Sequence, residues 1–96
     1  MKRKKAEELS VLLQRFLRES GLESPLNQHR LVEMWPEVVG ELVSKATDQI
    51  FIQNQTLVIH LTSPILKNEI AMRSTALVHE LNRRVGANVI VDIKLI

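Results

Sequence analysis

Cysteine and tyrosine are absent from this 96-residue sequence, and Phe16, Trp35 and Phe51 are its only aromatic residues. Without cysteine there is no disulfide framework, no thiolate metal site and no thiol nucleophile. This absence agrees with a cytoplasmic location, where thiols stay reduced. No apolar run approaches the roughly 18 residues that a membrane-spanning helix needs, so no membrane association is expected.

Glycine is also scarce, with only three residues, so the sequence has no glycine-rich phosphate loop. The three histidines fall on three different predicted elements, and none is paired with a second ligand at a spacing that indicates a metal site. No serine lies in the signature of an activated nucleophile. We therefore expect no metal, no cofactor and no catalytic residue, and a binding protein rather than an enzyme.

The net charge of +2 hides two regions of opposite sign. The first region holds four adjacent cations, Lys2, Arg3, Lys4 and Lys5. The remaining nine basic and eleven acidic residues give the rest of the chain a charge of −2. We expect residues 1–6 to form a flexible basic tail and residues 7–96 to form one small domain. Such a tail attracts phosphates, as in DNA, although a solubilising, frayed terminus has the same composition.

Helical spacing of apolar residues predicts three helical regions. The first has an apolar stripe between Leu9 and Leu17, which we expect to face the core. The second starts at Ser24-Pro25, and a break or kink is expected at Trp35-Pro36, because proline disfavours helical geometry in the residue before it. Its pattern resumes to Ala46 and includes Gly40, which close packing would justify. The third is predicted as one helix over residues 64–85, started by Ser63-Pro64.

Alternating apolar residues predict three strands. Two of them flank Asn54-Gln55 as a hairpin, and the third covers residues 89–96. The fold class is therefore α+β, in the order α-α-β-β-α-β. We expect a three-stranded mixed sheet with the helices packed mainly on one face. The other face is a candidate binding surface, unless the first helix or a second subunit covers it; its predicted residues are Phe51, Val58, His60, Ile90 and Ile96.

Trp35 allows two interpretations. A lone tryptophan at a helix break is either a core residue or an exposed anchor for a partner protein. Composition alone favours the core, because a small domain has few large apolar side chains.

Several motifs together resemble one known family. Residues 35–40 read WPEVVG and resemble the signature W-x-x-[IV]-V-G, and Lys45-Ala46-Thr47 resembles the small and polar segment that follows it. Residues 54–59 are similar to N-G-x-L-x-V, with Gln55 in place of glycine, and Ser63 to Ile70 resembles a helix start of the type S-x-x-W-x-x-E-L. Residues 81–86 match L-N-x-x-x-G. In this order, from about Leu9 onward, the chain resembles the DciA family.

The resemblance implies a fold similar to type II KH domains. It also implies a partner, because members of this family bind the bacterial replicative DNA helicase and assist its loading in DNA replication, and some bind DNA through basic regions. The candidate helicase contacts are then Trp35, Pro36, Val39 and Gly40, and the candidate DNA contacts are Lys2, Arg3, Lys4 and Lys5.

Two other functions are compatible with the same residues. One is a KH-like module that binds RNA or single-stranded DNA, although residues 64–85 lack the glycines of the G-x-x-G loop that such domains carry. The other is a structural protein that dimerises through the apolar sheet face.

Overall fold

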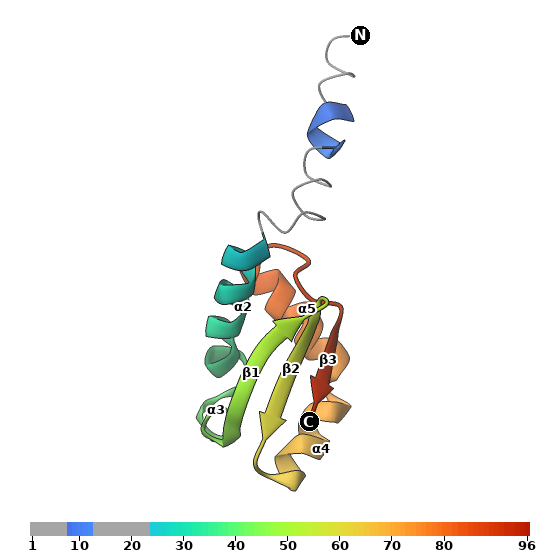
Figure 1. Ribbon diagram of the computed structural model, residues 1–96. Coiled ribbons are helices and arrows are strands. Elements are labelled where there is room, and N and C mark those ends of the chain that lie inside the picture. The colour runs from blue at the N-terminus through green and yellow to red at the C-terminus, as the bar shows by residue number, and fades with distance from the viewer. Residues whose placement is uncertain (1–7, 13–23) are drawn as a thin grey trace.

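The computed structural model describes residues 8–12 and 24–96 of the chain (Figure 1). A short helical turn covers residues 8–12. The remaining elements follow in the order α2 (Ser24–Val39), α3 (Glu41–Ala46), β1 (Thr47–Gln53), β2 (Thr56–Leu61), α4 (Pro64–Met72), α5 (Ser74–Val85) and β3 (Asp92–Leu95). The predicted basic tail lies outside the described residues.

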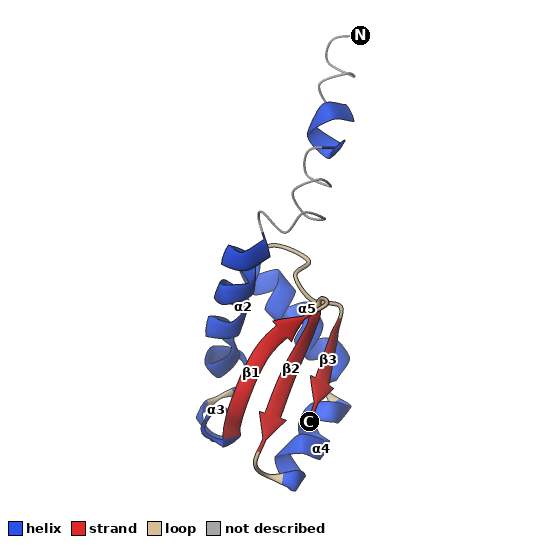
Figure 2. Ribbon diagram, viewed as in Figure 1, coloured by secondary structure: helices blue, strands red, loops and turns tan. Residues whose placement is uncertain are grey.

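The three strands form one mixed sheet in the order β1-β2-β3. Strand β1 pairs with β2 antiparallel, and β2 pairs with β3 in parallel. Helices α4 and α5 lie behind the sheet in Figure 1, and α2 packs against α5. Figure 2 shows the same two-layer arrangement, with one sheet face left open. The predicted α+β class and mixed sheet are confirmed, and the arrangement is consistent with a KH-like fold.

The core lies between the sheet and the helices. Among the described residues every buried one is hydrophobic. Strand β2 is central, and Leu57, Ile59 and Leu61 point from it toward the helices. Leu31 and Trp35 of α2 and Leu77 and Leu81 of α5 meet them there. The spacing of these residues, two in the strand and about four in the helices, produces the two layers.

Helix α2 runs through Pro36 and ends at Val39, so of the predicted break or kink at Trp35-Pro36 the break is wrong. A proline inside a helix removes one backbone hydrogen bond and costs about 3 kcal/mol. Leu31 and Trp35 lie one turn apart on the same side of α2 and are both almost fully buried. Their burial, at about 1.5–3 kcal/mol for a large apolar side chain, offsets that cost and keeps Trp35 helical.

The chain breaks instead at Gly40, which the sequence placed inside a helix. Gly40 has φ +90° and ψ 173°, and it separates α2 from α3. An added Cβ at this position would meet no atom within 4 Å. Close packing is therefore not the reason for this glycine. The reason is its backbone conformation, which side chains disfavour.

The predicted single helix over residues 64–85 is two helices. Helix α4 ends at Met72, and α5 starts at Ser74. Arg73 lies between them with φ −108° and ψ 9°, outside helical geometry. The Arg73 amide donates to the Ile70 carbonyl at 3.1 Å, which closes α4 with a tight turn. Ile70 of α4 and Leu77 of α5 both belong to the core on either side of this turn.

The last strand is shorter than predicted, because it starts at Asp92 and not at residue 89. Asn82 of α5 holds the segment before it. The Asn82 Oδ1 accepts hydrogen bonds from the Val89 and Ile90 amides at 3.0 and 3.1 Å, and its Nδ2 donates to the Ile90 carbonyl at 2.8 Å. These bonds turn Ile90 into the core, where it is 1% exposed. Ile90 is therefore not part of the open sheet face.

The N-terminal turn agrees with prediction in type but not in burial. Residues 8–12 are helical, yet Leu9 and Leu12 are exposed and do not join the core. The inner sheet face is already covered by α2, α4 and α5, so no space remains there for a further stripe. The rest of the predicted stripe lies outside the described residues.

The predicted hairpin turn is confirmed at Asn54-Gln55. Both residues have positive φ, 52° and 60°, which defines the type I′ turn that matches the twist of two-residue hairpins. Asparagine tolerates this geometry, whereas glutamine is strained by about 1–2 kcal/mol.

Replacing Gln55 with glycine is expected to stabilise the domain. Glycine removes the left-handed strain but loses about 0.5–1 kcal/mol of backbone entropy, so the expected net gain is about 0.5–1 kcal/mol. For a domain of this size the melting temperature should rise by roughly 3–6 °C in a thermal unfolding scan. Asn54→Gly is the control and should raise it less. An unchanged melting temperature for Gln55→Gly would show that the turn is not strained.

Candidate functional site

Trp35 lies inside the fold, at the point where α2, α3 and β1 meet. Its side chain is 2% exposed. The indole Nε1–H donates to the Thr47 Oγ1 at 3.0 Å, and the Thr47 hydroxyl donates to the Val43 carbonyl at 2.8 Å. A buried indole N–H needs such a partner. Trp35 therefore fixes the junction of three elements, and its ring does not present a surface to solvent.

The surface of this junction consists of the residues that follow Trp35. Pro36 and Gly40 are exposed, and Val39 is half-buried. Leu42 on α3 is 73% exposed. We call Pro36, Val39, Gly40 and Leu42 the α2–α3 corner. The corner is small and apolar, and Trp35 determines its shape from below.

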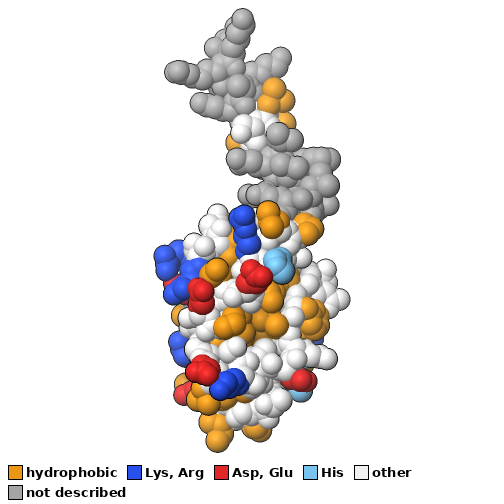
Figure 3. Space-filling view, turned by 90° about the vertical axis from the view of Figure 1, so that its left-hand side faces the viewer, with side chains coloured by type: hydrophobic (Ala, Val, Ile, Leu, Met, Phe, Trp, Pro, Cys, Tyr) orange, Lys and Arg blue, Asp and Glu red, His pale blue; other side chains and the backbone are white. Residues whose placement is uncertain are grey.

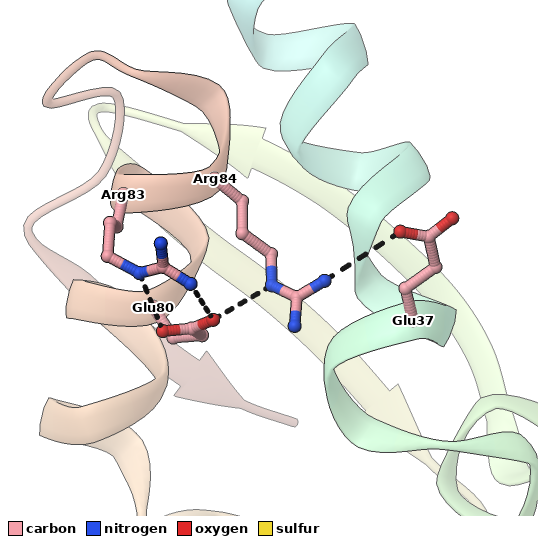
Figure 4. A network of polar contacts seen from close by, with 4 residues as sticks. All are labelled: Glu37, Glu80, Arg83 and Arg84. Atoms are coloured by element: carbon pink, nitrogen blue, oxygen red, sulfur yellow. Dashed lines mark hydrogen bonds and ion pairs between the residues drawn. The ribbon is translucent and has the colours of Figure 1, made fainter.

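A network of charged side chains on α5 reaches the neighbouring α2 through Arg84 (Figure 4). Glu80 accepts from Arg83 Nη2 at 2.7 Å and from Arg84 Nε at 2.8 Å. Arg84 reaches the other way, and its Nη1 lies 3.8 Å from the Glu37 carboxylate. Glu37 sits between Pro36 and Val38 in α2, so this chain of charges runs from α5 to the α2–α3 corner. These arginines are therefore largely neutralised within the domain.

Arg83, and next Arg84, hydrogen-bond the Glu80 carboxylate and lower its pKa from 4.5 to about 2. A carboxyl with a lowered pKa stabilises the fold at pH values above its ordinary pKa, and this stabilisation is lost as the pH falls toward the lowered value.

The stability of the wild-type domain should therefore fall more steeply between about pH 5 and pH 2 than that of Glu80→Gln. Urea unfolding at several pH values, followed by circular dichroism, measures the difference between the two proteins. Glu69→Gln, on α4, is the control and should keep the wild-type slope. Equal slopes for wild type and Glu80→Gln would contradict the pairing.

Four of the five residues predicted for the open sheet face lie on it, namely Phe51, Val58, His60 and Ile96, whereas Ile90 is in the core. Phe51 is 42% exposed, and His60 is half-buried, with its Nδ1 3.1 Å from the Asp48 carboxylate. Val58 also points to this face, but it is only 7% exposed, because Phe51 and Lys94 flank it on the neighbouring strands. Phe51, Val58, Lys94 and Ile96 line an open depression there.

The described residues, 8–12 and 24–96, contain no group of three acidic, histidine or cysteine side chains that could hold a metal ion. No helix in those ranges is long and apolar enough to cross a membrane. Lys2, Arg3, Lys4 and Lys5 lie outside the described residues. Two features of the described residues were not predicted from the sequence. The exposure of Leu42 depends on the break at Gly40. The hydrogen bonds of Asn82 cannot be inferred from the motif in which it lies.

Comparison with known proteins indicates the family to which the chain belongs. A search among curated proteins finds no significant match. The model of one protein family, described as Dna[CI] antecedent, DciA, matches residues 8–95. The match includes the described turn at 8–12, the whole α2–α3 corner and all three strands. Because it covers nearly the entire sequence, the chain belongs to the DciA family.

Proposed function

We propose that this chain binds the replicative DNA helicase of a bacterium and assists its loading in DNA replication. Membership of the DciA family over residues 8–95 is the observation that carries the proposal. Among the described residues no cluster of side chains could hold a metal ion, so no metal site there competes with a binding role. The function requires a protein surface rather than a catalytic group, and a cytoplasmic location accompanies it.

The α2–α3 corner is the proposed helicase contact. Interfaces are centred on exposed apolar groups that become buried on binding. Leu42 supplies such a group, and Pro36 and Gly40, in the segment that precedes it, are also exposed. Trp35 acts as a positioning residue, because it is buried beneath them and cannot meet a partner without unfolding.

A pull-down with purified replicative helicase tests the proposal. The wild-type chain should bind at micromolar concentration, and Leu42→Glu should weaken binding at least about tenfold, because it places a charge at the centre of an apolar contact. Val91→Glu is the matched control. Val91 is 68% exposed, and its amide bonds to Gln55 at the opposite end of strand β1, so this variant should bind as wild type does.

The possible results separate the site from the function. No binding by the wild-type chain would contradict the helicase proposal itself. Binding that is lost in Val91→Glu and kept in Leu42→Glu would move the contact away from the corner. Circular dichroism of each variant checks that it is folded before its binding is compared.

We also propose that the basic residues Lys2, Arg3, Lys4 and Lys5 give the chain a weak affinity for DNA. Support comes from the charge distribution, because the remainder of the sequence carries a net charge of −2. Within α5 the two adjacent arginines are paired with Glu80 and Glu37, which leaves them less available to phosphates.

A further inference from the structure

Strand β1 forms one edge of the sheet, and within residues 8–12 and 24–96 no strand pairs with its outer side. It is seven residues long, Thr47–Gln53, and contains neither proline nor lysine. Edge strands usually carry such residues, because an unprotected edge is a template for another strand. Asp48 is the only charged residue of β1, and it lies at the start, beside a bulge. The stretch from Gln49 to Gln53 is therefore uncharged and regular.

The pairing register decides which backbone groups face outward. The two-residue turn closes on the pair Gln53 and Thr56. In an antiparallel hairpin this closing pair is hydrogen-bonded, and hydrogen-bonded pairs then alternate along the strands. Gln49, Phe51 and Gln53 therefore bond to β2. The N–H and C=O groups of Ile50 and Ile52 point away from β2, toward the open edge.

The sequence of this edge is a palindrome. Residues 49–53 read Gln-Ile-Phe-Ile-Gln in both directions. We propose that two copies of the chain associate through β1, antiparallel about a two-fold axis at Phe51, into one continuous six-stranded sheet. Each residue then opposes its own type: Phe51 opposes Phe51, Ile50 opposes Ile52, and Gln49 opposes Gln53.

The alternation along β1 of backbone groups that bond to β2 and groups that face the open edge agrees with this axis. Ile50 of one copy and Ile52 of the other form hydrogen-bonded pairs, which use the outward-facing groups. The two Phe51 residues form the close, non-hydrogen-bonded pair, with Cα atoms about 4.5 Å apart. Phe51 is 42% exposed in the single chain and borders the open depression, so the pairing buries aromatic surface on the open sheet face.

The surroundings of the edge support a second copy. Figure 3 looks at the side of the molecule where α2 lies, and hydrophobic side chains gather across its middle, between charged groups above and below. Ile50 and Ile52 themselves are half-buried against the core. About the proposed axis Asp48 opposes Asn54, so no like charges meet. The opposite edge is less suitable, because β3 has four residues and carries Asp92 and Lys94.

Concentration-dependent measurements on the full chain test the pairing. Sedimentation velocity should show a monomer–dimer equilibrium with a dissociation constant of roughly 10–1,000 µM, as for small transient interfaces. Hydrogen exchange followed by NMR should show the Ile50 and Ile52 amides slowing as the dimer forms. A chain that stays monomeric at about 1 mM would overturn the proposal, as would a dimer in which these two amides are not protected.

The palindrome supplies a matched pair of variants. Gln49→Lys with Gln53→Lys places like charges opposite each other across the axis, twice by symmetry, and should weaken the dimer about tenfold. Gln49→Lys with Gln53→Glu places opposite charges there and should keep it at least as tight as in wild type. Both glutamines are exposed, so both variants should fold. Equal dissociation constants for the two variants would overturn this register. Neither the α2–α3 corner nor the basic tail takes part, so this result is independent of helicase binding.

Discussion

Replacing Trp35 with alanine is expected to lower the free energy of unfolding by about 3–5 kcal/mol. The side chain is 2% exposed and holds α2 to Thr47 at the start of β1, so its removal leaves a cavity at a junction of three elements. A domain of this length has a total stability of roughly 5–14 kcal/mol. The variant should therefore unfold at much lower urea concentration, as followed by circular dichroism.

Trp35→Phe separates the structural role of this residue from a contact role. Phenylalanine keeps most of the apolar volume but loses the hydrogen bond to Thr47, so the expected loss of stability is about 1–2 kcal/mol. This variant should remain folded and should still bind the helicase. A folded Trp35→Phe that no longer binds would show that the indole itself contacts the partner. A loss of less than about 1 kcal/mol in Trp35→Ala would contradict its place in the core.

DNA binding is expected to depend steeply on salt through the four terminal cations. If all four of Lys2, Arg3, Lys4 and Lys5 contact phosphates, the affinity for duplex DNA should fall about 100-fold between about 50 and about 200 mM salt. Replacing all four with glutamine should remove most of this dependence and most of the binding at low salt. Fluorescence anisotropy with a labelled duplex measures both quantities.

The control for this experiment keeps the charge and changes the side chain. Lys2→Arg, Lys4→Arg and Lys5→Arg together should bind DNA about as wild type does, because the salt-dependent contribution counts charges. If the glutamine variant kept the wild-type salt dependence, DNA would bind elsewhere on the chain. That result would favour a nucleic-acid surface on the folded domain, as in the KH-like alternative.

Local patterns were sufficient to predict the sheet. The alternation of Leu57, Ile59 and Leu61 with outward residues predicts a strand, and positive φ at Asn54 and Gln55 confirms the turn between β1 and β2. The order of elements then limits the topology to a hairpin with a helical crossover. The α+β fold class follows from these few signals, because each acts over a short stretch of sequence.

The structure differs from the sequence-based predictions where contacts with other parts of the chain decide the local structure. Pro36 stays helical because Leu31 and Trp35 are buried on the same helix. The break at Arg73 carries no glycine or proline signal and depends on how α4 and α5 pack. Ile90 follows the outward alternation of β3, yet Asn82 turns it inward.

The candidate site was predicted only in outline. The motif around Trp35 covers the corner that we propose as the contact, but burial separates Trp35 from Pro36 and Gly40, which are close to it in sequence. The exposure of Leu42 depends on the turn at Gly40 and on the orientation of α3, and no spacing in the sequence specifies these. The motif therefore indicates the segment that we propose as the contact, and packing decides which of its side chains are exposed.

The attachment of β3 has a consequence for how the domain opens. This strand has four residues, and the segment before it is held by Asn82, by the Val91 amide, which donates to the Gln55 carbonyl, and by the buried Ile90 side chain. A short strand at the edge of a sheet can open locally at a lower free energy than the whole domain. The C-terminal strand is thus the natural unit of partial unfolding, whereas the β1–β2 hairpin and α2 stay folded together. Such an opening would uncover Leu57 and Ile59 along the inner edge of β2, and proteases would find the chain first between Gly86 and Asp92.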